Sequence, residues 1–152
     1  QYGIYSARHP LDFERQLSLL EQLEGTPALN VQTRLERAIL LHLNQRHRNA
    51  DKEFQALRRE LRNTGALVTV PPRLRKFVNS STALPIECEG RVVPSTGYKQ
   101  MARISQLGDV TVPFEPLEFG EREVPIGRRI SCVIDFSFRG PFAHPTKARG
   151  SS

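Results

Sequence analysis

The sequence contains little cysteine, and this scarcity excludes several kinds of protein. Its two cysteines, Cys88 and Cys132, are far apart, and neither belongs to a CxxC motif or lies beside a pair of histidines. Two such residues are too few for a zinc site or a disulfide scaffold. Because free cysteine is among the residue types most often buried, we expect two buried thiols. They predict a reducing intracellular compartment and a protein that is not secreted.

Long apolar runs and recognisable catalytic motifs are also missing. No segment approaches the roughly 20 apolar residues that a helix needs to cross a bilayer. The histidines, His9, His42, His47 and His144, are scattered, and none has HxxxH or HExxH spacing. Glycine-rich phosphate loops, GxSxG elbows and nucleophile–His–acid orders are absent as well. We therefore expect no enzyme, with no catalytic residue, no metal, no cofactor and no small-molecule substrate.

Four positions have a polar side chain that a structural role explains better than chemistry. His42 lies in a leucine-rich helical segment, where a histidine is more often a packed or capping residue than a ligand. Glu87 and Glu89 share one face of an expected strand, but without a third ligand they indicate a solvent-facing surface. Asp135 is the one acid in an otherwise apolar setting, and we expect it to face water.

The chain has a basic surplus that is concentrated in its first half. Lys and Arg number 22 against 16 Asp and Glu, which gives a net charge of +6 and a pI near 9.9. Such a balance favours an anionic partner: nucleic acid, phospholipid headgroups or an acidic protein. Residues 1–76 hold 13 basic and 8 acidic residues, whereas residues 77–152 hold 9 and 8. The surplus lies chiefly between Arg46 and Lys76.

Residues 10–64 have the apolar periodicity of three amphipathic helices. The first is expected to begin with Pro10, because a helix start does not use the missing N–H. The second begins at Thr26-Pro27 or at Asn30. The third begins near Asn49 or Asp51 and ends at Gly65, a residue type suited to the left-handed position after a helix. The apolar stripes of the first two consist of Phe13, Leu17, Leu20 and Leu23, and of Val31, Leu35, Ala38, Ile39 and Leu43.

Residues 66–140 are rich in short runs of Val, Ile and Phe that are separated by Pro and Gly, a pattern typical of strands. In the last run Ile130, Cys132, Ile134, Phe136 and Phe138 alternate with mainly polar residues, as in a half-buried strand. Strands are not interleaved with helices, so the fold class is α+β, with N-terminal helices packed on a C-terminal, mostly antiparallel sheet. The expected strands are 66–70, 85–93, 100–107, 109–114 and 128–138.

We expect one domain over residues 1–143, with a helical part at 10–64 and a strand-rich part at 66–140, followed by a flexible tail at 144–152. A chain of 152 residues has a common single-domain size. The tail, HPTKARGSS, has no apolar residue beyond Ala148, so little holds it to a core.

The third helix has its charges sorted onto two flanks. With successive residues about 100° apart and Phe54 at zero, Ala50, Leu57 and Leu61 form the buried stripe. Glu53 and Glu60 lie on one flank. The opposite flank, at about 80° to 160°, contains Arg48, Lys52, Arg59 and Arg62, and Arg58 borders the core beside Asp51.

This sorting favours a contact surface for an anion. A helix built only for solubility more often interleaves its charges to gain from Glu–Lys pairs four residues apart. Guanidinium groups that lie close together can bind phosphates or headgroups. The RLRK segment (73–76) could extend this cationic surface. The simpler alternative is a solvent-exposed helix face that binds no partner. The expected anion or nucleic-acid contacts are Arg48, Lys52, Arg58, Arg59, Arg62, Arg73, Arg75 and Lys76.

Three segments of the C-terminal half occur in an order and at a spacing that resemble the β-rich part of vesiculovirus-type rhabdovirus matrix proteins. They are CEGRVVP (88–94), VPF (112–114) and VPIGRRISCVIDFSF (124–138). The resemblance places no functional residue on this chain. It implies a small non-enzymatic structural protein that self-associates and bridges a ribonucleoprotein to an anionic membrane. It also implies the cytoplasm of a host cell or the interior of a virion.

The sequence thus predicts a viral matrix-like assembly protein whose basic surface contacts a ribonucleoprotein, RNA phosphates or an anionic membrane, and which forms oligomers with itself. Two alternatives remain open. One is a basic nucleic-acid-associated module of a ribosome or ribonucleoprotein. The other is a protein–protein adaptor whose charge is incidental. The helix has no interleaved aromatic residues, so any nucleic acid would bind through phosphates, with little sequence preference and a steep salt dependence.

Overall fold

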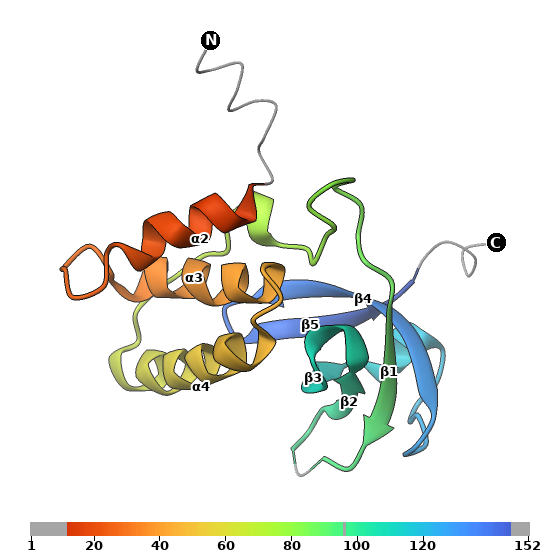
Figure 1. The fold of residues 1–152 in the computed structure, drawn as a ribbon. Helices are drawn as coiled ribbons and strands as arrows, with labels where there is room; N and C mark the ends of the chain where they lie inside the picture. The colour runs from red at the N-terminus through yellow and green to blue at the C-terminus, as the bar shows by residue number, and fades with distance from the viewer. Residues whose placement is uncertain (1–11, 96, 147–152) are drawn as a thin grey trace.

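The computed structural model describes residues 12–95 and 97–146. Three helices precede a five-stranded barrel and cover one end of it (Figure 1). At that end the β2–β3 turn lies close to the start of α4. The distance is short at Gly108, where an added Cβ would lie 3.3 Å from the His47 side chain. The β4–β5 turn approaches the same helix at Gly140, whose Cβ would lie 3.7 Å from Phe54. The helices are α2 (Phe13–Glu21), α3 (Val31–Leu43) and α4 (His47–Thr64).

Side-chain and glycine caps define most of the helix ends. The Asp12 carboxylate accepts a hydrogen bond from the backbone N–H of Arg15 at 3.0 Å, and the Asn30 side chain accepts one from Thr33 at 3.0 Å. Such caps satisfy N–H groups that have no partner within the helix. Of the two expected starts for α3, the structure therefore has Asn30. Gly65 follows α4 with φ 67°, as expected.

The start of α4 differs from the expectation. The helix begins at His47, one turn or less before the expected Asn49 or Asp51, and its N-cap residue, Arg46, makes no side-chain capping bond. The earlier start is stabilised by the buried His47 ring, which packs against Phe77. Tertiary packing therefore extends the helix beyond the point that local capping signals indicate. The expected first residue of the first helix, Pro10, lies outside the described residues.

The strands close into a barrel in the order β1-β2-β3-β5-β4, and β4 returns to pair with β1. Four of the strand pairs are antiparallel, and β3 pairs with β5 in parallel. The predicted α+β class, with helices before a mostly antiparallel sheet, is confirmed. The closure of the sheet is an additional finding. The strands are β1 (Cys88–Val93), β2 (Gln100–Ile104), β3 (Val110–Phe114), β4 (Arg129–Ser137) and β5 (Gly140–Pro145).

Residues 66–70, expected as a strand, are not one. Their backbone is held instead by the side-chain amide of Gln32 on α3. Gln32 Nε2 donates to the Thr69 carbonyl oxygen at 2.8 Å, and the Thr69 N–H donates to Gln32 Oε1 at 3.0 Å. One amide thus supplies both hydrogen bonds that a neighbouring strand would supply. Val68 and Val70 pack against the core without joining the sheet.

The strand β5 was not predicted, because its sequence, GPFAHP, contains two prolines and little alternation. It extends to Pro145, so the first two residues of the expected flexible tail belong to the barrel. His144 in this strand lies 3.0 Å from a Glu118 carboxylate oxygen. Residues 147–152 of the expected tail lie outside the described residues.

The apolar face of β4 points into the barrel as predicted, through Ile130, Cys132, Ile134 and Phe136. Phe138 follows the strand and is exposed. Cys132 lies directly opposite Cys88 of β1 in the register. Both thiols are buried, as expected, and burial raises the pKa of each to about 12. Within the described residues, none of the helices has the length and apolar content to span a bilayer.

Candidate nucleic-acid interface

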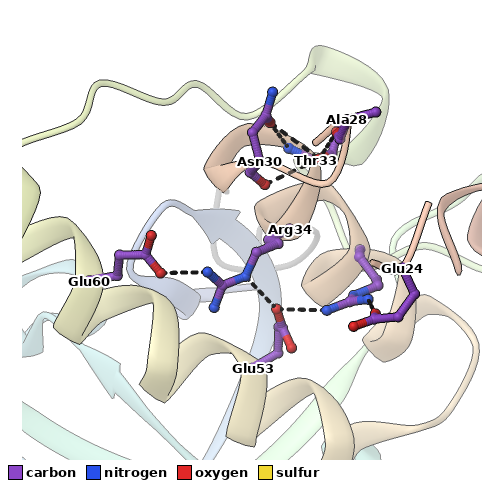
Figure 2. Close-up of polar contacts among 8 residues, drawn as sticks. Glu24, Ala28, Asn30, Thr33, Arg34, Glu53 and Glu60 are labelled. Atoms are coloured by element: carbon purple, nitrogen blue, oxygen red, sulfur yellow. Dashed lines mark hydrogen bonds and ion pairs between the residues drawn. The ribbon is translucent and has the colours of Figure 1, made fainter. Parts of the chain in front are cut away.

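The acidic flank of α4 faces α3, where two arginines bind it (Figure 2). Arg34 Nε lies 3.2 Å from Glu53, and its Nη1 lies 2.5 Å from Glu60. Arg37 contacts the same Glu53 oxygen at 3.1 Å and Glu24 at 2.6 Å. Burial lowers the pKa of Arg34, but its hydrogen bonds with Glu60 and Glu53 raise the pKa more. The two glutamates are therefore occupied within the helical layer.

The opposite flank of α4 contains the four cations that the helical spacing predicts. Arg48, Lys52, Arg59 and Arg62 are all exposed. Within the part of the chain that the structure describes, none of their side chains takes part in an ion pair or a hydrogen bond. Four unpaired positive charges on one side of an 18-residue helix raise the local potential and attract anions. We name Arg48, Lys52, Arg59 and Arg62 the α4 flank.

Arg58, expected as a fifth contact on this helix, has a structural partner. Its Nη1 donates to the carbonyl oxygen of Arg139 at 2.6 Å, which ties α4 to the β4–β5 turn. Partial burial lowers the pKa of Arg58, and the nearby charge of Arg62 lowers it further, although Asp51 raises it. Arg58 also lines a pocket between α4 and the barrel.

The RLRK segment does not make its hydrogen bonds with α4. Arg73 donates to Gln16 of α2 at 3.1 Å and to Glu36 of α3 at 3.4 Å. Lys76 pairs with Asp135 of β4 at 3.4 Å. Arg75 is exposed, and its carbonyl oxygen accepts a hydrogen bond from the N–H of Phe136. The segment thus links the helices to β4, and Asp135, expected to face water, is half-buried and paired.

Three arginines that the sequence analysis did not single out lie side by side on the outer wall of the barrel. Arg91 of β1 is directly opposite Arg103 of β2 on one side and Arg129 of β4 on the other. All three are exposed. Strand alternation alone places each on an outward face, but the cross-strand register that brings them together involves segments far apart in the sequence. We name these residues the barrel arginines.

The barrel arginines and the α4 flank border two neighbouring pockets. Arg103 belongs to both: one pocket also has Arg91 and Arg129 in its wall, and the other has Arg48 and Arg58. The acidic residues of these walls are Asp51, Glu89 and Asp109. Within the described residues no arginine of the two pockets lies in ion-pair distance of those carboxylates. Arg103 therefore lies between the barrel arginines and Arg48, the member of the α4 flank that lines the second pocket.

The buried titratable groups of the helix–barrel junction form a closed pair. His42 Nδ1 lies 2.9 Å from His47 Nδ1, and His47 Nε2 lies 3.1 Å from Gln45 Oε1. Because the glutamine oxygen can only accept, His47 carries its proton on Nε2 and accepts from His42 at Nδ1. His42 Nε2 then remains an unpaired acceptor, consistent with its lack of a hydrogen-bond partner. The His42 ring packs against Phe54 and Phe136, and the His47 ring packs against Phe77.

His42 is the packed residue that the sequence analysis favoured. Its ring is fully buried and lies 6.0 Å from Phe54 and 5.6 Å from Phe136, between centroids. Burial, and secondly the neighbouring His47, lower the pKa of His42 to about 3. Within residues 12–95 and 97–146, no group of three or more His, Cys, Asp or Glu side chains could hold a metal ion.

Comparison of the chain with protein-family models, with curated proteins and with solved structures yields no match. The resemblance of residues 88–94, 112–114 and 124–138 to rhabdovirus matrix proteins therefore stays a prediction.

Proposed function

We propose that this protein is a non-enzymatic assembly protein that binds the phosphates of RNA in a ribonucleoprotein through the α4 flank. The single observation that carries the proposal is the division of charge on α4. Arg34 and Arg37 bind the glutamates of the helix, whereas the side chains of the α4 flank have no hydrogen-bond or ion-pair partner among the described residues. The ion pairs explain where the acids lie. A polyanion would explain why the cations gather opposite them.

The composition of this surface favours phosphates that are held by hydrogen bonds. Three of the four cations of the α4 flank are arginines, and the guanidinium fork can donate two parallel hydrogen bonds to one phosphate. The flank has no aromatic residue for stacking with bases. The expected binding is therefore independent of sequence and strongly dependent on salt. The proposal also includes a reducing intracellular compartment, which the two thiols predict, and self-association, which the matrix-like resemblance implies.

Fluorescence anisotropy with a labelled RNA of random sequence tests the proposal. The variant R59Q/R62Q removes two cations from the α4 flank, and the control R15Q/R122Q removes two exposed arginines from other surfaces. We expect the first variant to bind at least about tenfold more weakly and to lower the slope of log K against log salt by about 1.4 to 1.8. We expect the control to remain close to the unchanged protein.

Two results would oppose this function. Equal losses of RNA affinity in both variants would show that RNA binding depends on net charge and does not use the α4 flank. No binding of RNA by the unchanged protein at 50 mM salt would leave the adaptor alternative in its place. Sedimentation with anionic vesicles tests the membrane alternative. If the partner is a membrane, the protein would bind the vesicles more tightly than it binds RNA.

A further inference from the structure

The barrel arginines form an arrangement that is unfavourable for the isolated barrel. Arg91 lies in register with Arg103 and Arg129, so its side chain has a like charge beside it on both neighbouring strands. Side chains directly opposite each other on one face of a sheet have Cβ atoms about 4.5–5.5 Å apart, and like charges there destabilise the pair. A barrel wall that serves stability alone would alternate charges at these positions.

The central arginine of this row is held in place. Arg91 Nη1 donates to the carbonyl oxygen of Gly127 at 3.2 Å, and the Gly127 N–H donates to the Val92 carbonyl oxygen at 2.8 Å. The guanidinium is thus fixed to the β3–β4 connection while its remaining N–H groups are free to donate. A donor that is already positioned loses less conformational entropy on binding.

We infer that the barrel arginines continue the α4 flank into a single track for the phosphodiester backbone of a single-stranded nucleic acid. This inference rests on the proposed function and deepens it by naming the form of the ligand. Arg103 connects the two parts, since it lines both the pocket with Arg91 and Arg129 and the pocket with Arg48. Phosphates placed between the opposed guanidinium groups relieve their repulsion.

The path of the track selects a flexible strand over a duplex or a membrane. It runs from a helix, through the pocket between α4 and the barrel, and onto a curved barrel wall. A duplex is stiff over a length far greater than this domain, about 150 base pairs for DNA, so it would contact one part of the track only. A membrane surface would likewise reach the convex parts and leave the pocket empty. A single strand can follow the helix, the pocket and the barrel wall.

The test compares charge-matched double variants on two probes. R91Q/R103Q alters the barrel arginines, R59Q/R62Q alters the α4 flank, and R15Q/R122Q serves as control. The probes are a labelled 20-nucleotide oligouridylate and a 20-base-pair RNA duplex. We expect R91Q/R103Q to weaken oligouridylate binding about tenfold, to lower the salt slope by about 1.4, and to change duplex binding much less. The single variant R103Q removes one of the like charges and, among the described residues, no hydrogen bond, so its unfolding midpoint without ligand should equal or exceed that of the unchanged protein.

The outcomes separate the two proposals. If R59Q/R62Q weakens binding but R91Q/R103Q does not, the track is rejected and the proposed function stands. If neither variant differs from the control, both are rejected. Equal losses on the duplex, or on vesicles containing 30% phosphatidylserine, would show that the barrel arginines respond to any negative surface, and this result also overturns the single-strand inference. A lowered unfolding midpoint for R103Q would reject the claim that these charges repel one another.

Discussion

Arg34 of α3 and Glu53 of α4 form an ion pair at 3.2 Å, and Arg37 binds the same glutamate oxygen at 3.1 Å. This shared glutamate links the two helices and determines which flank of α4 faces its neighbour. Cations beside the two arginines of α3 would repel them, and the four cations of the α4 flank lie on the other side of the helix. The interior of the helical layer and the outer surface are therefore two consequences of one arrangement of charge.

The first prediction concerns this shared glutamate. We expect Glu53→Gln to lower the free energy of unfolding by about 1–3 kcal/mol, because two largely buried arginines lose a charged acceptor. The Glu53 side chain is only 17% exposed, so water replaces the lost partner poorly. Urea denaturation measures the change. Glu87→Gln, at an exposed position, is the control and should stay within about 0.5 kcal/mol. Similar losses in both variants would assign no special role to the ion pairs.

The second prediction concerns pH. In the unfolded chain His42 titrates near its ordinary pKa of 6.5, whereas in the folded protein its pKa is about 3. The unfolded state therefore binds more protons in this interval, and the stability that the neutral ring supplies is lost as the pH falls below 6.5. The loss approaches about 1.4 kcal/mol per pH unit for this one group. Burial lowers the pKa of His47 too, which acts in the same direction.

Urea denaturation at a series of pH values between 7.5 and 4.5 measures this dependence. The matched variant is His42→Phe, which keeps an aromatic ring between Phe54 and Phe136 and removes the titrating group. Carboxylates contribute equally to both proteins, so the difference between the two curves isolates His42. We expect the gap to be constant above pH 6.5 and to shift in favour of the variant below it. Parallel curves throughout would contradict a buried neutral imidazole.

The third prediction tests the packing inside the barrel. Gly90 of β1 faces the interior, and a Cβ at this position would lie 2.7 Å from the Ile104 side chain and 3.2 Å from Ala102. We expect Gly90→Ala to destabilise the protein by about 1–3 kcal/mol, because the neighbouring side chains must move out of their packed positions. Gly97→Ala is the control, since its Cβ would meet nothing within 4 Å. Unchanged melting temperatures for both variants would show that the barrel interior has free space at Gly90.

Local patterns in the sequence were sufficient for a large part of the fold. The spacing of Phe13 and Leu17, the Asn30 cap and the Gly65 stop identified the helices, because these signals act within one or two helical turns. The alternation around Cys132 identified β4 for the same reason, since neighbouring residues of a strand face opposite sides. The division of α4 into an acidic and a cationic flank also follows from local geometry, and the structure confirms that division.

Other features depend on contacts between distant segments. Residues 66–70 have the composition of a strand, but Gln32 occupies their backbone groups, and β5 forms from an unpromising sequence because β3 and β4 pair with it. Arg58 borders the core on a helical wheel and was expected as an anion contact, yet the Arg139 carbonyl oxygen accepts from it. Gln32 and Arg139 are far in the sequence from the groups that they bind, and β3 is far from β5, whereas β4 is the strand directly before β5.

The sequence by itself determined the α+β class, the helical flank of Arg48, Lys52, Arg59 and Arg62, and the inward face of β4, because side-chain direction follows from the local period of a helix or strand. Only the tertiary structure decided that the sheet closes into a barrel and that Arg91 lies between Arg103 and Arg129. The physical reason is the register of the strands, which is selected by the whole core that they enclose. If one strand moved by one residue relative to its neighbour, the arginine of that strand would turn to the other face.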